Sequence, residues 1–173
     1  GLIVQEYYPE NIAIDYEKSG IGALSILTEK KFFDGNIDDL SLVSQKTNIP
    51  ILRKDFIIDP YQILESKIYN ADAILLITTI LNDDEIKKFI NLATQYNLDC
   101  LIEIHNEEEL KRAVSIDYPI IGINNRNLKN LKVDSNYALN LINKIPKNFT
   151  IVAESGIKTK EEILKYNDAG VFN

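Results

Sequence analysis

The 173-residue chain has no tryptophan, no methionine, one cysteine and one histidine. The single cysteine, Cys100, cannot form a disulfide within the chain, which excludes a disulfide-stapled scaffold. Cys100 lies in the apolar run DCLIEI, where we expect a small buried side chain rather than a nucleophile. The chain also lacks an apolar run near the roughly 18 to 20 residues of a membrane span, and its start lacks the basic region of a signal peptide. We therefore expect a soluble, cytoplasmic protein with no membrane partner.

Long runs of like charge are also absent, although the chain has 19 basic and 26 acidic residues and a formal charge of −7. This balance makes nucleic acid an unexpected partner. An acidic surface does not exclude a small anionic ligand, because a local cluster of Lys and Arg in a cleft can still attract one.

The ends of the chain predict a piece of a longer protein. There is no methionine, the first residue is a glycine, and the last residues, NDAGVFN, stop as a new apolar run begins. The length is enough for one sizeable core and too short for two ordinary domains. We therefore expect residues 1–173 to form one partial domain.

Six apolar, β-branched runs alternate with segments whose apolar residues recur at spacings of three and four. The first pattern predicts strands and the second predicts helices. The predicted strands are 23–29, 50–56, 72–77, 99–105, 119–125 and 150–155. The predicted helices lie within 9–20, 36–48, 59–71, 82–97, 106–115, 134–145 and 159–170.

Strands this apolar are typical of a parallel sheet with helices on both faces. No glycine-rich GxGxxG or GxxxxGK[ST] turn follows any of them, which disfavours the nucleotide-binding open sheets. Polar residues instead end strand after strand, at the position where a (β/α)8 barrel has its active site. We therefore predict an α/β fold, namely a (β/α)8 TIM barrel. Because such a barrel takes about 200 residues or more, at least one strand is expected to be missing.

Residue parity sorts the polar side chains at the strand ends, because side chains alternate along a strand. If Leu52 faces the inside of the barrel, Lys54 and Phe56 face it too. Arg53 and Asp55 then face the helices, and we expect them to be structural.

The same parity directs Glu103, Asn124 and Glu154 toward the pocket that Lys54 faces. Burying two carboxylates at the ends of apolar strands is costly, and a lysine among them in an apolar pocket has a pKa that its surroundings can shift. These four residues are our candidate catalytic groups. His105 lies at the edge of its strand, and we interpret it as structural.

Ser155 and Gly156 end the last predicted strand and precede a helix that begins near Thr159. Backbone N–H groups and a hydroxyl at such a turn can hold an anion, and barrel loops after the seventh and eighth strands frequently bind phosphate. Arg126, at the neighbouring strand end, adds a positive charge. These residues are candidate phosphate ligands, although Ser-Gly is also ordinary turn chemistry.

Six motifs, in order, identify a family: TEKKFFDG, PILRKDFIIDPYQI, ADAILLI, LIEIHNEEEL, IGINNRNL and VAESGI. Together they closely resemble indole-3-glycerol-phosphate synthase, a (β/α)8 barrel enzyme of tryptophan biosynthesis. The resemblance runs along the whole chain. It implies that the chain holds strands 2 to 7 of the barrel and the start of strand 8.

By this resemblance the parent protein is a carboxy-lyase that needs no cofactor and no metal. It would close an indole ring on a phosphorylated small molecule, 1-(2-carboxyphenylamino)-1-deoxyribulose 5-phosphate, with loss of carbon dioxide and water. Fusion to, or association with, other tryptophan-pathway enzymes stays open. The family's first strand supplies a glutamate and a second lysine, and its eighth-strand loop supplies phosphate-binding glycines. Since these are not among the 173 residues, we expect activity in the full-length parent and not in this piece alone.

The resemblance also assigns roles to individual residues. Lys54 matches the general acid of ring closure, Glu103 matches the carboxylate of the dehydration step, and Asn124 and Glu154 match residues that orient the substrate. The other matches are substrate contacts: Phe33 and Phe56 on the apolar wall of the anthranilate ring, and Arg126, Ser155 and Gly156 on the phosphate side.

Three other functions stay open. A Schiff-base aldolase could use Lys54 as its nucleophile, and trapping with borohydride would reveal the adduct. Another phosphosugar barrel, such as the neighbouring isomerase of the pathway, would not need two aromatic walls. The chain could also serve only as an assembly piece, which would leave no catalytic pocket to restore by complementation.

Overall fold

The computed structural model describes residues 6–126, 132–134 and 136–171. The described residues form two compact units. The first runs to Leu75 and includes residues 91–99, and the second comprises residues 76–90 and those from Cys100 onward. Each unit is described by itself.

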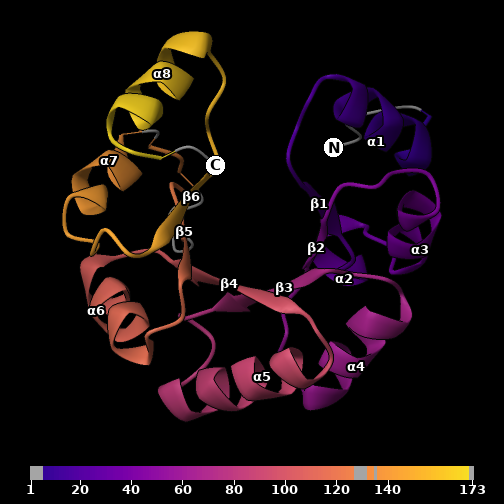
Figure 1. The fold of residues 1–173 in the computed structure, drawn as a ribbon, viewed down its shortest axis with the longest axis horizontal. Coiled ribbons are helices and arrows are strands. Elements are labelled where there is room, and N and C mark those ends of the chain that lie inside the picture. Colours follow the sequence, from indigo (N-terminus) through magenta and orange to yellow (C-terminus); the bar gives the residue numbers. More distant parts are fainter. Residues whose placement is uncertain (1–5, 127–131, 135, 172–173) are drawn as a thin grey trace. The chain divides into compact units, whose positions relative to one another are not determined.

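Strands and helices alternate along the chain (Figure 1). All six predicted strands are present: β1 (Leu24–Leu27), β2 (Ile51–Lys54), β3 (Ala73–Ile77), β4 (Asp99–Ile104), β5 (Ile120–Asn124) and β6 (Thr150–Glu154). Neighbours in the sheet follow chain order, and the pairs β1–β2, β2–β3, β4–β5 and β5–β6 are parallel. The parallel α/β part of the prediction is therefore confirmed. Phe172 and Asn173, where the start of a further strand was predicted, lie outside the described residues.

The seven predicted helices are also present, and one short helix was not predicted. The helices are α1 (Pro9–Lys18), α2 (Lys30–Phe33), α3 (Asp38–Ser44), α4 (Pro60–Ile68), α5 (Asp83–Gln95), α6 (Glu107–Ile116), α7 (Tyr137–Ile142) and α8 (Lys160–Asp168). Most of their starts carry local signals: Pro9 and Pro60 occupy first helical positions, and side chains cap α4, α6 and α8. Among the described residues, no helix is long and apolar enough to cross a membrane.

Two polar residues at the end of β1, Thr28 and Glu29, make contacts within the first unit, and the unpredicted helix α2 accounts for Glu29. The carboxylate of Glu29 accepts hydrogen bonds from the N–H groups of Lys31 (3.0 Å) and Phe32 (2.6 Å), so Glu29 is the N-cap of α2. Thr28 donates to the carboxylate of Asp55. Both polar side chains are therefore used within the first unit to hold its own structure.

Consecutive residues of β3, β4 and β5 are buried, so these three strands are covered on both faces. Ile74 and Leu76 of β3, Ile102 of β4 and Ile121 and Ile123 of β5 are fully buried. Cys100 is buried and free, as predicted. Polar side chains in such strands are therefore confined to the strand ends, where the candidate site residues lie.

Candidate active site

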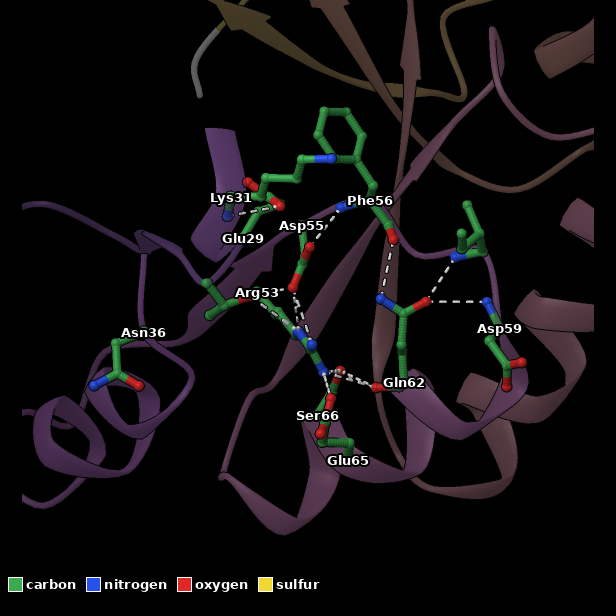
Figure 2. Close-up of polar contacts among 12 residues, drawn as sticks. Glu29, Lys31, Asn36, Arg53, Asp55, Phe56, Asp59, Gln62, Glu65 and Ser66 are labelled. Atoms are coloured by element: carbon green, nitrogen blue, oxygen red, sulfur yellow. Dashed lines mark hydrogen bonds and ion pairs between the residues drawn. The ribbon is translucent and has the colours of Figure 1, made fainter. Parts of the chain in front are cut away.

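Arg53, near the end of β2, lies among polar side chains of the first unit (Figure 2). The Arg53 side chain is 4% exposed, and its guanidinium lies 2.9 Å from the carboxylates of both Asp55 and Glu65. It also donates to the carbonyl of Gln62 (3.0 Å) and to the hydroxyl of Ser66 (3.2 Å). Because Gln62, Glu65 and Ser66 belong to α4, Arg53 connects β2 to that helix. The prediction that Arg53 and Asp55 are structural is confirmed.

Lys54 lies on the opposite face of β2. Since Arg53 points toward α4, alternation along the strand directs the neighbouring side chain away from that helix. The β1–β2 register aligns Lys54 with Leu27, so these two share a face of the sheet. This agrees with the predicted orientation of Lys54, whose catalytic role stays a prediction.

Three aromatic rings gather beside the ends of β1 and β2. The ring centroids of Phe33 and Phe56 are 6.1 Å apart with their planes tilted by 37°. Phe32 meets Phe56 edge to face at 6.3 Å. The structure thus brings together the two predicted wall residues, Phe33 and Phe56. Phe32 was missed because the short helix α2 that presents it was not predicted, although KKFF was a visible signal.

Hydrogen bonds from α4 fix the turn that carries Phe56. The carbonyl of Phe56 accepts from the side-chain amide of Gln62 (3.0 Å), and its N–H donates to the Asp55 carboxylate (2.8 Å). The side-chain oxygen of Gln62 in turn accepts from the N–H groups of Ile58 (2.8 Å) and Asp59 (3.0 Å). Figure 2 shows these contacts around Gln62. The backbone of Phe56 is therefore held by the cap of a helix.

In the second unit, three candidate residues share one face of the sheet. The register aligns Glu103 with Gly122, and Asn124 with Glu154. Paired residues of a parallel sheet point the same way, as do residues two apart on one strand. The side-chain amide of Asn124 donates to Oε2 of Glu103 over 3.1 Å. Glu103, Asn124 and Glu154 therefore meet at the carboxyl ends of β4, β5 and β6.

Gly122 makes room for the carboxylate of Glu154. A Cβ at Gly122 would collide with Oε1 of Glu154 and come within 3.3 Å of Leu101. Glu154 therefore lies over the glycine, and any side chain at position 122 would push its carboxylate aside. This requirement explains a glycine in the middle of an apolar strand.

Asn125 connects the end of β5 to neighbouring helices by hydrogen bonds, as Arg53 connects β2 to α4. Its side-chain amide donates to the carbonyl of Ser155 (3.0 Å) and to the hydroxyl of Tyr166 in α8 (2.8 Å). Its side-chain oxygen accepts from the N–H of Ala138 in α7 (2.9 Å). Asn125 therefore ties two helices to the end of the sheet. This role was not predicted, although Asn124 and Asn125 have opposite parity along the strand, which was a signal.

Two of the three predicted phosphate ligands, Arg126 and Gly156, lie beside Val133. Ser155 and Gly156 have positive φ angles of 66° and 78°, a conformation that is unusual for serine and stores local strain. A Cβ at Gly156 would collide with the side chain of Val133, which forms an antiparallel bridge with Arg126. The N–H of Arg126 donates to the side chain of Asn124 (2.9 Å). Arg126 and Gly156 are thus both adjacent to Val133, while phosphate binding stays a prediction.

His105 contacts one of the candidate catalytic carboxylates. Its Nε2 lies 3.1 Å from Oε1 of Glu103, and its Nδ1 lies 3.3 Å from Oε2 of Glu109. The Nε2 contact has ion-pair distance without the alignment of a hydrogen bond. Sequence reasoning missed Glu109, although Asn106 followed three residues later by a glutamate was a signal for a capped helix. Among the described residues, no three His, Cys, Asp or Glu side chains form a metal-binding group.

The fold resembles solved structures of low sequence identity. The 3-hexulose-6-phosphate synthase from Salmonella typhimurium matches 93% of this chain and 79% of its own, with a TM-score of 0.76 and 10% identity. The N-acetylmannosamine-6-phosphate 2-epimerase from Clostridium perfringens matches 99% of this chain and 80% of its own, with a TM-score of 0.73 and 15% identity. These similarities define the class of the fold, a parallel α/β protein.

The sequence comparisons define the family. The indole-3-glycerol phosphate synthase family model matches residues 1–173. The indole-3-glycerol phosphate synthase of Caldanaerobacter subterraneus is 49% identical over 171 residues, and that of Campylobacter jejuni subsp. doylei is 44% identical over 171 residues. Each alignment covers 99% of this chain and 66% of the relative's length. The chain belongs to the indole-3-glycerol phosphate synthase family.

Proposed function

We propose that the protein containing this chain is an indole-3-glycerol-phosphate synthase of tryptophan biosynthesis, a carboxy-lyase. Its substrate would be 1-(2-carboxyphenylamino)-1-deoxyribulose 5-phosphate, and its products indole-3-glycerol phosphate, carbon dioxide and water. The observation that carries the proposal is the match of the family model to all 173 residues. We further propose that the sheet belongs to a (β/α)8 barrel, in which β1 to β6 are the second to seventh strands of one domain.

The first unit would supply the acid and the apolar wall of the reaction. In ring closure, the aromatic carbon that bears the carboxylate attacks the ketone carbon, and Lys54 protonates the developing alkoxide. Loss of carbon dioxide then returns an electron pair to the ring and restores its aromaticity. The paired rings of Phe33 and Phe56, 6.1 Å apart, support this role because they offer an apolar surface that can hold the anthranilate ring in an attacking orientation.

The second unit would supply the groups for dehydration and orientation. Loss of water requires a proton to leave a carbon while a hydroxyl departs from its neighbour, and we assign the proton transfer to Glu103. Its hydrogen bond with Asn124 supports this role because a held carboxylate stays aligned for proton transfer. Asn124 and Glu154 would orient the substrate, and Arg126, Ser155 and Gly156 would contact its phosphate.

The test is turnover of the protein containing this chain, followed by the fluorescence of the indole product. Lys54→Ala and Glu103→Gln should each lower kcat by about 10² or more, because each removes an acid or base group. Two exposed residues provide matched controls, and Lys46→Ala and Glu107→Gln should leave kcat unchanged. Near-full turnover in K54A or E103Q would refute the role of that residue. Absence of indole formation by the unmodified protein, or a borohydride-trapped adduct on Lys54, would refute the function.

A further inference from the structure

Next to Glu103, which the proposed function uses, two residues that it does not use complete a buried line of carboxylate, imidazole and carboxylate in the second unit. Glu103, His105 and Glu109 come from β4, the residue after it and α6. Their side chains are 3%, 7% and 10% exposed. The imidazole lies between the two carboxylates, with one ring nitrogen 3.1 Å from the first and the other 3.3 Å from the second.

Glu109 is held rigidly at the far end of this line. Its carboxylate accepts hydrogen bonds from the N–H of His105 (2.7 Å), the hydroxyls of Thr78 (2.8 Å) and Thr79 (3.0 Å), and the side-chain amide of Asn106 (2.9 Å). Burial alone would raise the pKa of Glu109, but the contacts with His105 and the two threonines outweigh it and lower the pKa to about 2. Glu109 is therefore ionised at any working pH of the protein.

An ionised Glu109 favours a protonated His105. Burial alone would lower the pKa of His105, but the contacts with Glu103 and Glu109 outweigh it and raise the pKa to about 9. The hydroxyl of Thr79, 3.2 Å from Nδ1, can accept from the ring while it donates to Glu109. The imidazole is therefore a cation at neutral pH.

Other ionisable groups near the line do not oppose this charge. From α7, Tyr137 stays neutral, because burial and then the charges of Glu109 and Glu107 raise the pKa of its phenol. Glu107 lies 2.6 Å from Lys144. Arg112, on the next turn of α6, pairs with Asp83 at 2.7 Å and donates to the carbonyl of Thr78.

We propose that His105 is a positioning residue for Glu103, holding its carboxylate ionised and fixed in direction, with Glu109 as the anchor of the imidazolium. The contacts divide the two oxygens of Glu103: Oε1 faces the imidazolium at 3.1 Å, and Oε2 accepts from Asn124 at 3.1 Å. The hydrogen bond at one oxygen and the ion-pair contact at the other both restrain rotation of the carboxylate. A cation beside a carboxylate favours its ionised form, which is the form that accepts a proton. The catalytic part of this inference rests on the proposed function.

The first experiment measures the charge of His105 without using activity. The ring is titrated by NMR in the protein containing this chain, and its signal is identified as the one absent from His105→Gln. We expect a midpoint near pH 9, and a midpoint at least one pH unit lower in Glu109→Gln. A midpoint near the ordinary 6.5 in the unmodified protein would overturn the inference, whatever the enzyme's activity.

The second experiment measures the pH dependence of kcat/KM. Removing a cation beside a carboxylate raises the pKa of that carboxylate by about 1 to 3 units. His105→Gln should therefore shift the acidic limb of the kcat/KM profile to higher pH by at least one unit. Glu107→Gln, an exposed carboxylate on the same helix, should leave the limb in place. A lower kcat in H105Q with an unmoved limb would indicate a merely structural histidine and overturn the inference. Failure of the unmodified protein to form indole would instead refute the proposed function, and the NMR titration would still decide the charge.

Discussion

Arg53 and Lys54 are adjacent cations with different surroundings. On the side of α4, the Arg53 guanidinium contacts two carboxylates, a hydroxyl and a carbonyl. The side chain of Lys54 extends from the opposite face of β2. The same division separates Asn124, which contacts Glu103, from Asn125, which ties α7 and α8 to the sheet. In both pairs one residue faces the helices and is hydrogen-bonded to them. Mutations of the two members should therefore affect different properties.

For Arg53, the affected property is stability. Arg53→Ala leaves the buried carboxylate of Asp55 and the half-buried carboxylate of Glu65 without their cation, and should lower the free energy of unfolding by about 3 to 5 kcal/mol. Denaturant unfolding of the protein measures this loss. Lys144→Gln is the control, because its ion pair with Glu107 is about half exposed and should be worth about 1 kcal/mol or less. Equal losses in the two variants would contradict the structural role of Arg53.

The charge of His105 predicts a pH-dependent stability. Folding raises the pKa of His105 from 6.5 to about 9, so its stabilisation is complete below pH 6.5 and is lost as the pH rises through 9. The difference in unfolding free energy between the unmodified protein and His105→Gln should therefore shrink from pH 6 to pH 9.5. We expect a change on the order of 1 to 2 kcal/mol, since solvent screens part of the effect.

Denaturant unfolding at several pH values checks this dependence. The corresponding difference for Glu107→Gln should be nearly constant over the same range, because that carboxylate is ionised throughout. If the difference in unfolding free energy between the unmodified protein and H105Q stays constant or grows with pH, the imidazole is neutral in the folded protein.

At the scale of elements, two helices begin with the same capping arrangement in different places. In α4 the box pairs Asp59 with Gln62, and in α8 it pairs Thr159 with Glu162. Gln62→Ala and Glu162→Ala should each cost about 1 kcal/mol of stability. Only Gln62 also donates to the carbonyl of Phe56. Loss of the Gln62 side chain should therefore release the turn that carries the Phe56 ring.

The expected functional difference is a higher KM in Gln62→Ala and an unchanged KM in Glu162→Ala. A loss of about 1 kcal/mol in substrate binding corresponds to an increase of roughly fivefold. Initial rates over a range of substrate concentrations measure both variants beside their unfolding curves. If the two variants raise KM equally, the capping amide of α4 does not position the aromatic wall.

The sequence predicted elements whose signals are local and missed contacts that depend on packing. The strands and seven helices follow from periodicity, prolines and capping residues along the chain itself. Helix α2 is only four residues long, too short to show a period. The contact between His105 and Glu109 depends on how α6 packs beside β4. It also depends on the hydroxyls of Thr78 and Thr79, which lie 31 and 30 residues before Glu109. Alternation along strands predicted which face each site residue uses, but it could not reveal these partners.

Across the whole molecule, the candidate groups divide by step of the proposed reaction. The first unit carries Lys54 and the aromatic rings assigned to ring closure, and the second carries the carboxylates assigned to dehydration. Both sets of groups belong to the 173 residues that the family model matches. Because ring closure with loss of carbon dioxide must precede loss of water, the two sets of groups should be separable in time.

This order predicts different behaviour for the two catalytic variants in a single turnover. With enzyme in excess, Glu103→Gln should release carbon dioxide faster than it forms the fluorescent indole, because the ring closes and the dehydration step stalls. Lys54→Ala should slow both signals together, since nothing after ring closure can proceed without it. The double variant should be as slow as the slower single variant rather than slowed by the product of both effects, because the steps are sequential. Simultaneous release of carbon dioxide and indole by Glu103→Gln would place Glu103 in ring closure and reverse this division of roles.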